Sequence, residues 1–94
     1  MAFFVVNSYH GPSWDPGRPM REQRLWPEHA AFMNALPEGF VVLGGPVGGG
    51  VRSMLVLRSE SEREARALLD PDPWIRSGHL VEVIEPWEIL LGTP

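Results

Sequence analysis

The segment Leu69-Asp70-Pro71-Asp72-Pro73-Trp74-Ile75-Arg76-Ser77-Gly78 separates the second of two expected helices from the last expected strand. Each proline fixes its own φ and biases the residue before it toward extended geometry, so Asp72 is held rigidly between Pro71 and Pro73. Pro71 ends the preceding helix, and Pro73 with Trp74 is typical of a single helical turn. The segment therefore divides the second half of the chain into helix, short turn and strand.

The helix before this segment begins at a double capping signal. Ser59 and Ser61 each precede a glutamate by three residues, Glu62 and Glu64, which predicts two overlapping capping boxes. The apolar face expected for this helix consists of Ala65, Leu68 and Leu69. We therefore expect it to lie on a sheet with its charged side toward water.

Residues 80–90 predict a long last strand, because side chains of two kinds alternate along them. The apolar face consists of Val81, Val83, Trp87 and Ile89, and the opposite face is marked by Glu82 and Glu88. Pro86 interrupts the run, and proline cannot donate to a strand ladder, so we expect it at a sheet edge or a bulge.

The chain begins with a strand, residues 2–9, that is apolar at both parities and so needs cover on both faces of its sheet. Residues 10–19 hold three prolines, two glycines and a tryptophan, which indicates a loop. Its length is typical of lids and binding loops. A helix is predicted from Pro27, and Pro37 and Gly39 end it. One face of this helix carries His29, Phe32, Met33 and Leu36.

Two short strands are predicted between the helices, at residues 40–43 and 52–58. Gly44-Gly45-Pro46 ends the first, and a glycine-rich connection leads to Gly50. No Gly-Lys-Ser/Thr follows these glycines and a strand comes next, so a phosphate-binding P-loop is not indicated. A turn that uses positive φ explains the glycines better.

The predicted order is βαββαβ with one extra helical turn, which is the ferredoxin-like α+β arrangement of a four-stranded antiparallel sheet. Two short helices cover one face of such a sheet and leave the other, still apolar, open to water. A patch of that size is typical of an interface. We therefore expect a homodimer packed sheet to sheet, a dimeric α+β barrel that encloses a central space.

The composition limits the possible functions. The 94 residues suffice for one domain, and the net charge of −4 with scattered arginines argues against a nucleic-acid partner. The chain has no cysteine, so disulfides and thiolate metal sites are excluded. We expect neither a signal peptide nor a membrane span, and a cytoplasmic location.

Several motifs together resemble the YciI-like (YCII-related) family of the dimeric α+β barrel superfamily. These motifs span roughly residues 22–90 and are Glu28-His29-Ala30-Ala31-Phe32, Gly44-Gly45-Pro46, Ser59 with residues 60–65, Asp72-Pro73-Trp74 with Gly78, and Pro86-Trp87. The resemblance implies one YciI-like domain over residues 1–94, sheet-to-sheet dimerisation, and an active-site pair at His29 and Asp72. Some members resemble dechlorinating or dehydrating enzymes that act on hydroxylated aromatic rings. The long loop over residues 11–19 departs from the family pattern.

A histidine paired with a carboxylate can act as a general acid and base, because the carboxylate orients the ring and the ring moves the proton. We therefore predict a cofactor-independent lyase, isomerase or dehydratase in which His29 is the base and Asp72 orients it. The alternative is a non-catalytic dimeric binding or accessory module. In that case His29 is a core histidine, and Asp72 shapes the turn or caps the short helix at Pro73.

Four further residues are candidates for contact with an unknown small-molecule ligand: Arg24, Trp26, Trp74 and His10. The tryptophans supply aromatic walls or core packing, and Arg24 can hold an anionic group. His10 lies at the start of the long loop, where a plain loop histidine is the alternative. His79 is given no role. The histidines lack the short spacing of a metal site, so we predict no metal and no cofactor.

Overall fold

The computed structural model describes residues 1–92, and its strands and helices follow the expected order. The elements are β1 (Ala2–His10), η1 (Met20–Glu22), α1 (Trp26–Asn34), β2 (Val41–Val47), η2 (Gly48–Gly50), β3 (Arg52–Ser59), α2 (Glu62–Leu69), α3 (Pro73–Arg76) and β4 (Leu80–Pro86). The sheet has the order β2-β3-β1-β4, and every neighbouring pair is antiparallel. The predicted ferredoxin-like α+β fold is confirmed.

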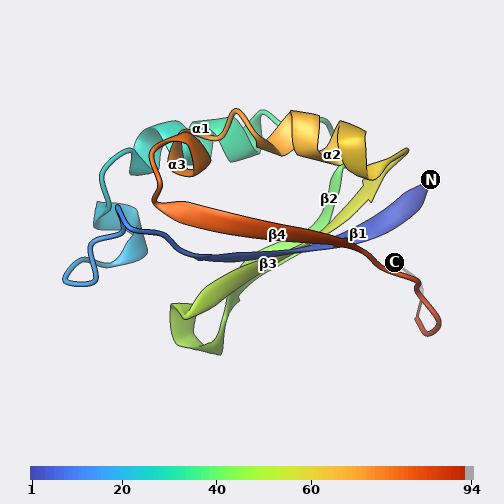
Figure 1. The fold of residues 1–94 in the computed structure, drawn as a ribbon, viewed down its shortest axis with the longest axis horizontal. Helices are drawn as coiled ribbons and strands as arrows, with labels where there is room; N and C mark the ends of the chain where they lie inside the picture. The colour runs from blue at the N-terminus through green and yellow to red at the C-terminus, as the bar shows by residue number, and fades with distance from the viewer. Residues whose placement is uncertain (93–94) are drawn as a thin grey trace.

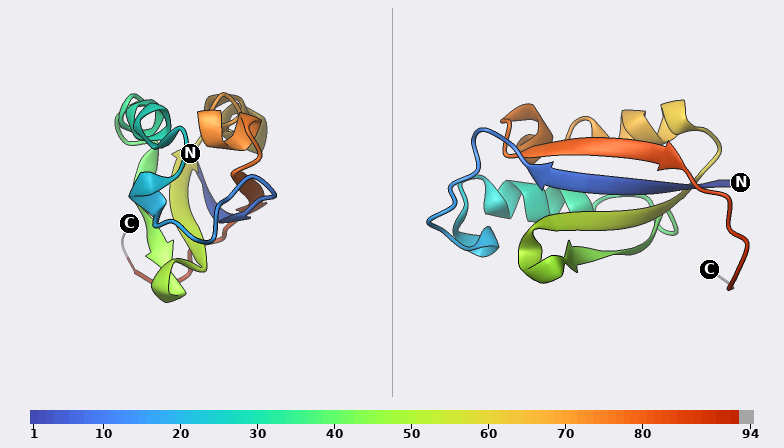
Figure 2. Two further views of the ribbon diagram at one scale, coloured as in Figure 1. Left: turned by 90° about the vertical axis from the view of Figure 1, so that its left-hand side faces the viewer. Right: turned by 60° about the horizontal axis from the view of Figure 1, so that its bottom comes forward.

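All three α-helices lie on one face of the sheet, as Figure 1 shows. Seen along the strands, α1 forms one row of helix and α2 with α3 forms a second row beside it (Figure 2). Between these rows and the sheet lies an apolar core of Phe4, Val6, Phe40, Leu57, Ala65, Leu69 and Ile84. Within residues 1–92, no helix has the length and apolar character that a membrane crossing requires.

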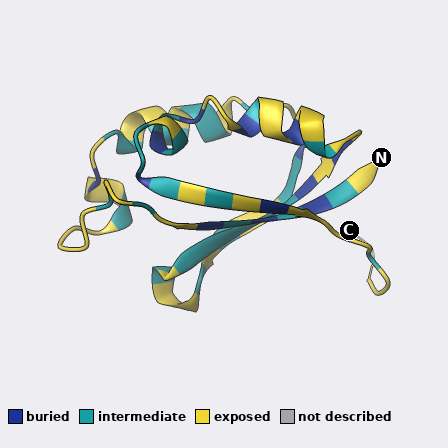
Figure 3. Cartoon of the chain, in the orientation of Figure 1, coloured by how far each residue is buried: buried dark blue, intermediate teal, exposed yellow. Residues whose placement is uncertain are grey.

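The two faces of the sheet differ in exposure because side chains alternate along each strand. Phe4, Val6 and Ser8 of β1 are buried under the helices, and the residues between them point the other way. On the uncovered face, Val81 and Val83 of β4 are 51% and 45% exposed. Figure 3 shows this alternation along β4. The open face therefore carries apolar side chains, as the sequence predicts.

Strand β2 is longer than predicted, because Gly44, Gly45 and Pro46 continue it instead of ending it. These residues pair with Leu55, Met54 and Ser53 of β3. An edge strand tolerates proline, since only one of its sides must supply ladder hydrogen bonds. Gly44 also leaves room for a neighbour, since a Cβ at this position would lie 2.5 Å from Leu55 Cδ2.

Strand β4 is shorter than predicted: it ends at Pro86, and residues 87–90 lie outside the sheet. The register explains the end, since Pro86 pairs with Phe4 and the Trp87 N–H donates to the Phe3 carbonyl at 2.9 Å. Because β1 begins at Ala2, its neighbour has almost no partner left beyond this point. The expectation that Pro86 lies at a sheet edge is confirmed, because β4 is an outer strand.

The helix signals are correct except for one serine. Ser61 caps α2, and its Oγ accepts from the Glu64 N–H at 3.1 Å. Ser59 is not a cap, because it belongs to β3 and its Oγ donates to the Ser61 carbonyl at 3.2 Å. One capping box is thus present where the sequence predicts two. The predicted apolar face of α2 is found, with Ala65 and Leu69 buried in the core.

Candidate functional site

His29 and Asp72 lie in direct contact, although 43 residues separate them in the chain. His29 Nδ1 is 2.8 Å from Asp72 Oδ1 and 2.9 Å from Oδ2. His29 stands in the first turn of α1, and Asp72 directly precedes α3. Their side chains are 13% and 3% exposed. The fold therefore holds an imidazole and a carboxylate together at the junction of two helices.

The carboxylate of Asp72 also caps α3. Asp72 Oδ1 accepts from the Trp74 N–H at 2.9 Å, and the Asp72 N–H donates to the Leu69 carbonyl at 3.0 Å. Pro73 stands at the first helical position, where its missing N–H leaves nothing unpaired. The capping role that the sequence leaves open is therefore observed, in the same side chain that orients His29.

The opposite nitrogen of the His29 ring is free. Among the hydrogen bonds of residues 1–92 none involves Nε2, and no side-chain nitrogen or oxygen in that part of the chain is both buried and unpartnered. Nε2 therefore keeps access to solvent or to a ligand. With Asp72 accepting from Nδ1–H, the lone pair of the neutral ring lies on Nε2.

Trp74 fixes the plane of the His29 ring. The two rings stack with centroids 4.1 Å apart and an interplanar angle of 9°. Trp74 is buried, and its Nε1–H donates to the Arg24 carbonyl at 2.8 Å. Trp26 packs beside both, with ring centroids 5.9 Å from His29 and 5.6 Å from Trp74. Two predicted ligand-contact residues thus adjoin the pair directly.

His10 joins this aromatic cluster only through the long loop. Its ring stacks on Trp14 at 3.9 Å, and Trp14 meets the edge of Trp74 at 5.4 Å. The loop is tied to the start of β4 by backbone bonds from Gly11 to the His79 carbonyl and from Ser13 to the Gly78 carbonyl. The loop is therefore an ordered wall beside the pair, and His10 lies on its far side.

Gln23 holds the rest of that loop in place. The sequence analysis did not predict this role. Its buried side chain binds both the N–H and the carbonyl of Asp15, at 2.9 and 2.7 Å, and the carbonyl of Arg18 at 2.8 Å. A glutamine in a loop gives no sequence signal for such a role. Only the folded path of the loop brings three backbone groups around one amide.

Arg24 faces a hollow of about 380 Å³ on the loop side of the molecule. Ser13, Asp15, Arg18, Glu22, Gln23, Arg24 and His79 line this hollow. Arg24 touches the aromatic cluster through its backbone carbonyl, which Trp74 binds. If Arg24 holds an anionic group, as the sequence predicts, that group binds in this hollow, near His79.

His79, which received no role from the sequence, is a buried member of the same region. Its Nδ1 lies 2.6 Å from Ser77 Oγ, and its ring is 5.9 Å from Trp74. Burial, reinforced by the charge of Arg24, lowers the pKa of His79 below its usual value. The ring is therefore held neutral near pH 7.

Glu82 of β4 is the second residue that the sequence analysis missed as a site candidate. It points to the helix side of the sheet, and its Oε2 accepts from Ser8 Oγ at 3.2 Å. Burial, together with the charges of Asp72 and Asp70, raises the pKa of Glu82 to about 7, against the opposing effects of the Ser8 hydrogen bond and His29. The signal was present in the alternation Leu80-x-Glu82-x-Ile84, which places Glu82 on the same face as two apolar residues.

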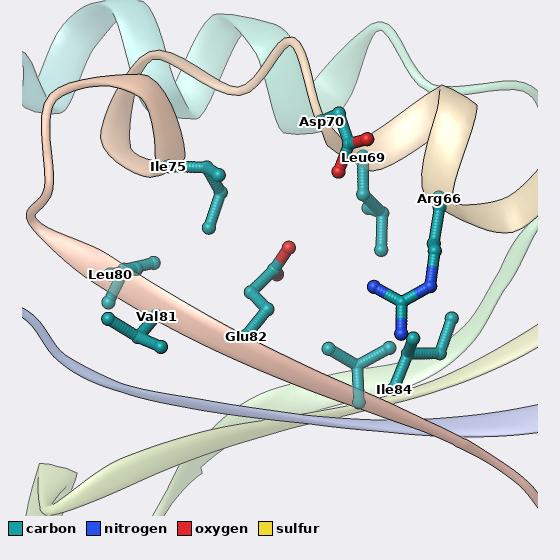
Figure 4. Close-up of a pocket in the computed structure, with 9 residues that line it drawn as sticks. Arg66, Leu69, Asp70, Ile75, Leu80, Val81, Glu82 and Ile84 are labelled. Carbon is teal, nitrogen blue, oxygen red and sulfur yellow. The ribbon is translucent and has the colours of Figure 1, made fainter.

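Glu82 projects into a cavity of about 230 Å³ between β4 and the helices α2 and α3 (Figure 4). Val6, Arg66, Leu69, Asp70, Ile75, Leu80, Val81, Glu82 and Ile84 line it. Neither His29 nor Asp72 belongs to this lining. In residues 1–92, no group of three or more histidine, aspartate or glutamate side chains is placed to hold a metal ion.

Comparison with known proteins gives a likeness to solved structures. No protein-family model and no curated protein sequence matches the chain. A solved structure of 5-chloro-2-hydroxyhydroquinone dehydrochlorinase (TftG) from Burkholderia phenoliruptrix AC1100, in complex with 2,5-dihydroxybenzoquinone, is similar with a TM-score of 0.68. The two chains are 22% identical, and the match covers 92% of this chain and 93% of the other. At this identity the likeness shows a shared fold, and it agrees with the ferredoxin-like α+β arrangement described above.

Proposed function

We propose that this protein is a cofactor-independent enzyme of the YciI-like family that carries out acid and base chemistry on a small molecule. The observation that supports this best is the His29–Asp72 contact at 2.8 Å on Nδ1, with Nε2 left unpartnered. A dehydrochlorinase with the same fold makes an elimination reaction a reasonable first class to test. Lyase, isomerase and dehydratase reactions share the first step that such a pair performs.

In that step, His29 Nε2 removes a proton from a carbon or a hydroxyl of the substrate. Asp72 accepts from Nδ1–H and stabilises the imidazolium that forms. In an elimination, the electron pair of the broken C–H bond becomes the new double bond, and the leaving group departs from the adjacent carbon with its bonding pair. In an isomerisation, the imidazolium returns the proton to a different carbon. Neither route needs a redox partner.

The surroundings of the pair suit a small aromatic substrate. Trp26 and Trp74 present ring faces beside His29, and the loop that carries His10 and Trp14 closes one side. Arg24, beyond the tryptophans, is the cation that we propose for an anionic substituent. Of the four ligand-contact residues that the sequence predicts, this arrangement favours Trp26 and Trp74 most directly.

We further propose that the enzyme is a cytoplasmic homodimer joined through the open face of the sheet. Val81, Val83, Tyr9 and Leu43 are exposed there, and burying such a face is favourable by roughly 25 cal/mol per Å² of apolar area. Sedimentation equilibrium at micromolar concentration should give twice the chain mass of 10.5 kDa. Val83→Lys should shift that mass to the monomer value, and a monomeric wild type would overturn the dimer.

A non-catalytic module remains the second candidate, because Asp72 is fully engaged as a helix cap and ring partner at 3% exposure. In that case the pair serves stability alone. The two functions differ in what His29→Gln does: a catalytic base is lost while folding is kept, whereas a structural histidine lowers the melting temperature first.

The activity test begins with 5-chloro-2-hydroxyhydroquinone and related hydroxylated and chlorinated rings, followed by chloride release and ultraviolet absorbance. For a ring that the wild type turns over, His29→Gln should lower kcat by about 100-fold or more, the usual contribution of a general base. Glu28→Gln, at an exposed position next to His29 on the same helix, is the control and should stay close to wild type. An unchanged kcat in His29→Gln would disprove the catalytic role.

A further inference from the structure

The cavity between β4 and the helices is lined by six aliphatic and three charged residues. Val6 of β1 lines it from the sheet. Figure 4 shows Ile84 and Leu80 on β4, with Leu69 and Ile75 facing them from α2 and α3. Its volume of about 230 Å³ exceeds the roughly 150 Å³ of an engineered apolar cavity that binds benzene. A compact hydrocarbon body the size of one six-membered ring therefore fits.

The polar groups of this cavity are mainly negative. Figure 4 shows the carboxyl group of Glu82 reaching into the space from β4 and Asp70 on the opposite, helical side. Within residues 1–92, the Asp70 side chain makes no ion pair or hydrogen bond, and Glu82 has one partner, Ser8. The one cation of the lining, Arg66, is already paired with Glu62 at 3.1 Å.

We propose that this cavity is a binding site for a small primary amine with a compact apolar body. The ammonium group would bind between the carboxylates of Glu82 and Asp70, and the hydrocarbon part would pack on the aliphatic walls. An anion is repelled by both carboxylates. A neutral alcohol of the same shape gains the same apolar contact but lacks the charge-assisted hydrogen bonds, which are about twice as strong as neutral ones.

Binding of an ammonium ion should be linked to the release of a proton from Glu82. The charged groups around Glu82 are Asp70 after α2, Asp72 before α3 and His29 on α1. Arg66 of α2 lines the same cavity and is paired with Glu62, and the uncharged Ser8 of β1 donates to Glu82. The pKa of Glu82 is about 7, so Glu82 is mostly protonated in acid solution and must lose its proton when an ammonium group binds there. Affinity should therefore rise about tenfold from pH 6 to pH 8, as the ionised fraction of Glu82 does.

The test uses benzylamine as the probe, with benzyl alcohol and benzoate as ligands of the same shape and different charge. Isothermal titration at pH 6 and pH 8, in two buffers of different ionisation enthalpy, gives both the affinity and the proton released. We expect benzylamine to bind more tightly than benzyl alcohol, benzoate not to bind, and a proton to leave at pH 6. Equal affinity for amine and alcohol, or binding that weakens with pH, would overturn the proposal.

Two variants assign the site. Glu82→Gln keeps the size of the side chain and removes its charge, and it should weaken benzylamine about tenfold or more at pH 8 and abolish the proton release. Glu38→Gln, exposed between α1 and β2, is the control and should bind as wild type does. Undiminished binding by Glu82→Gln would disprove the site.

The amine site and the proposed catalytic pair use different residues, because neither His29 nor Asp72 lines the cavity. His29 lowers the pKa of Glu82, so His29→Gln should shift the pH dependence of benzylamine binding. At pH 8, where Glu82 is largely ionised, His29→Gln should keep benzylamine affinity within about twofold while it loses kcat on a ring substrate. Each of the two proposals can thus fail without the other.

Discussion

Two carboxyl groups near the space between the sheet and the helices, those of Asp72 and Glu82, differ in burial and in the donors around them. Asp72 is buried with two donors aimed at it, His29 Nδ1 and the Trp74 N–H. Glu82 is partly buried with one neutral donor, Ser8, at 3.2 Å. The first group is anchored by a proline-bounded turn, and the second stands on a strand among aliphatic side chains.

The difference shows how burial and hydrogen bonding act separately on a carboxyl group. Donors compensate the lost hydration of an ionised group, and without enough of them burial favours the protonated form. For Glu82, burial therefore outweighs the Ser8 hydrogen bond, and the charges of Asp72 and Asp70 act in the same direction as burial. Asp72 thus has two donors that hold its carboxyl group in place, whereas Glu82, with one, exchanges a proton near neutral pH.

The largest expected effect comes from breaking the anchored carboxylate. Asp72→Ala leaves the Nδ1–H of His29 and the N–H of Trp74 without an acceptor in the interior, which should lower the free energy of unfolding by about 3 kcal/mol. Urea denaturation measures this loss. Asp70→Ala, two residues away with no side-chain hydrogen bond among residues 1–92, is the control and should change stability by less than about 0.5 kcal/mol. If Asp72→Ala and Asp70→Ala were equally stable, the two donors to Asp72 would not stabilise the fold as proposed.

A smaller and pH-dependent effect is expected from Glu82. Its pKa rises from 4.5 to about 7 on folding, so the folded state binds the proton more tightly than the unfolded chain. Stability from this group is therefore present below pH 4.5 and lost as the pH rises to about 7. Glu82→Gln escapes that loss and should be more stable than wild type by about 2 kcal/mol at pH 8 and unchanged at pH 4.

Thermal melts of wild type and Glu82→Gln at pH 4, 6 and 8 measure this difference. Glu38→Gln, exposed between α1 and β2, should melt as wild type does at each pH. If wild type and Glu82→Gln differ in stability by the same amount at pH 4 and pH 8, folding does not raise the pKa of Glu82.

The smallest effect concerns the single donor to Glu82. Ser8→Ala removes a hydrogen bond that lowers the pKa of Glu82, so this pKa should rise above its wild-type value of about 7. Carbon-detected NMR titration of the Glu82 carboxyl group follows the change directly. Ser53→Ala, at the position paired with Ser8 on β3, is the control. A pKa that falls in Ser8→Ala would mean that the serine does not stabilise the carboxylate.

Much of the fold was readable from local patterns. The alternation in residues 2–9, the helical spacing of His29 with Leu36 and the serine cap at residue 61 all mark elements that the structure contains. The errors came where a neighbouring strand decides the outcome. Gly44-Gly45-Pro46 contains strong turn signals, yet pairing with β3 keeps it extended, and the last strand ends at Pro86 because β1 offers no further partner.

The residues of the candidate site also fall into two groups, those that the sequence predicted and those that only the fold revealed. The resemblance to a family led to His29 and Asp72, and the fold places these two side chains in contact while their role in catalysis stays a prediction. Gln23, His79 and Glu82 had no comparable signal. Each of them acts through residues distant in sequence: loop carbonyls for Gln23, Trp74 and Arg24 for His79, and Ser8 with two aspartates for Glu82.

The sequence by itself determined the order of elements and the rigid aim of Asp72, because alternation, caps and prolines act over a few residues. The resemblance to a family already paired His29 with that carboxylate, and the tertiary structure decided which strand face is buried and which carboxyl group lacks donors. These depend on long-range register and on the loss of water around each group, and no short pattern in the chain encodes either of them.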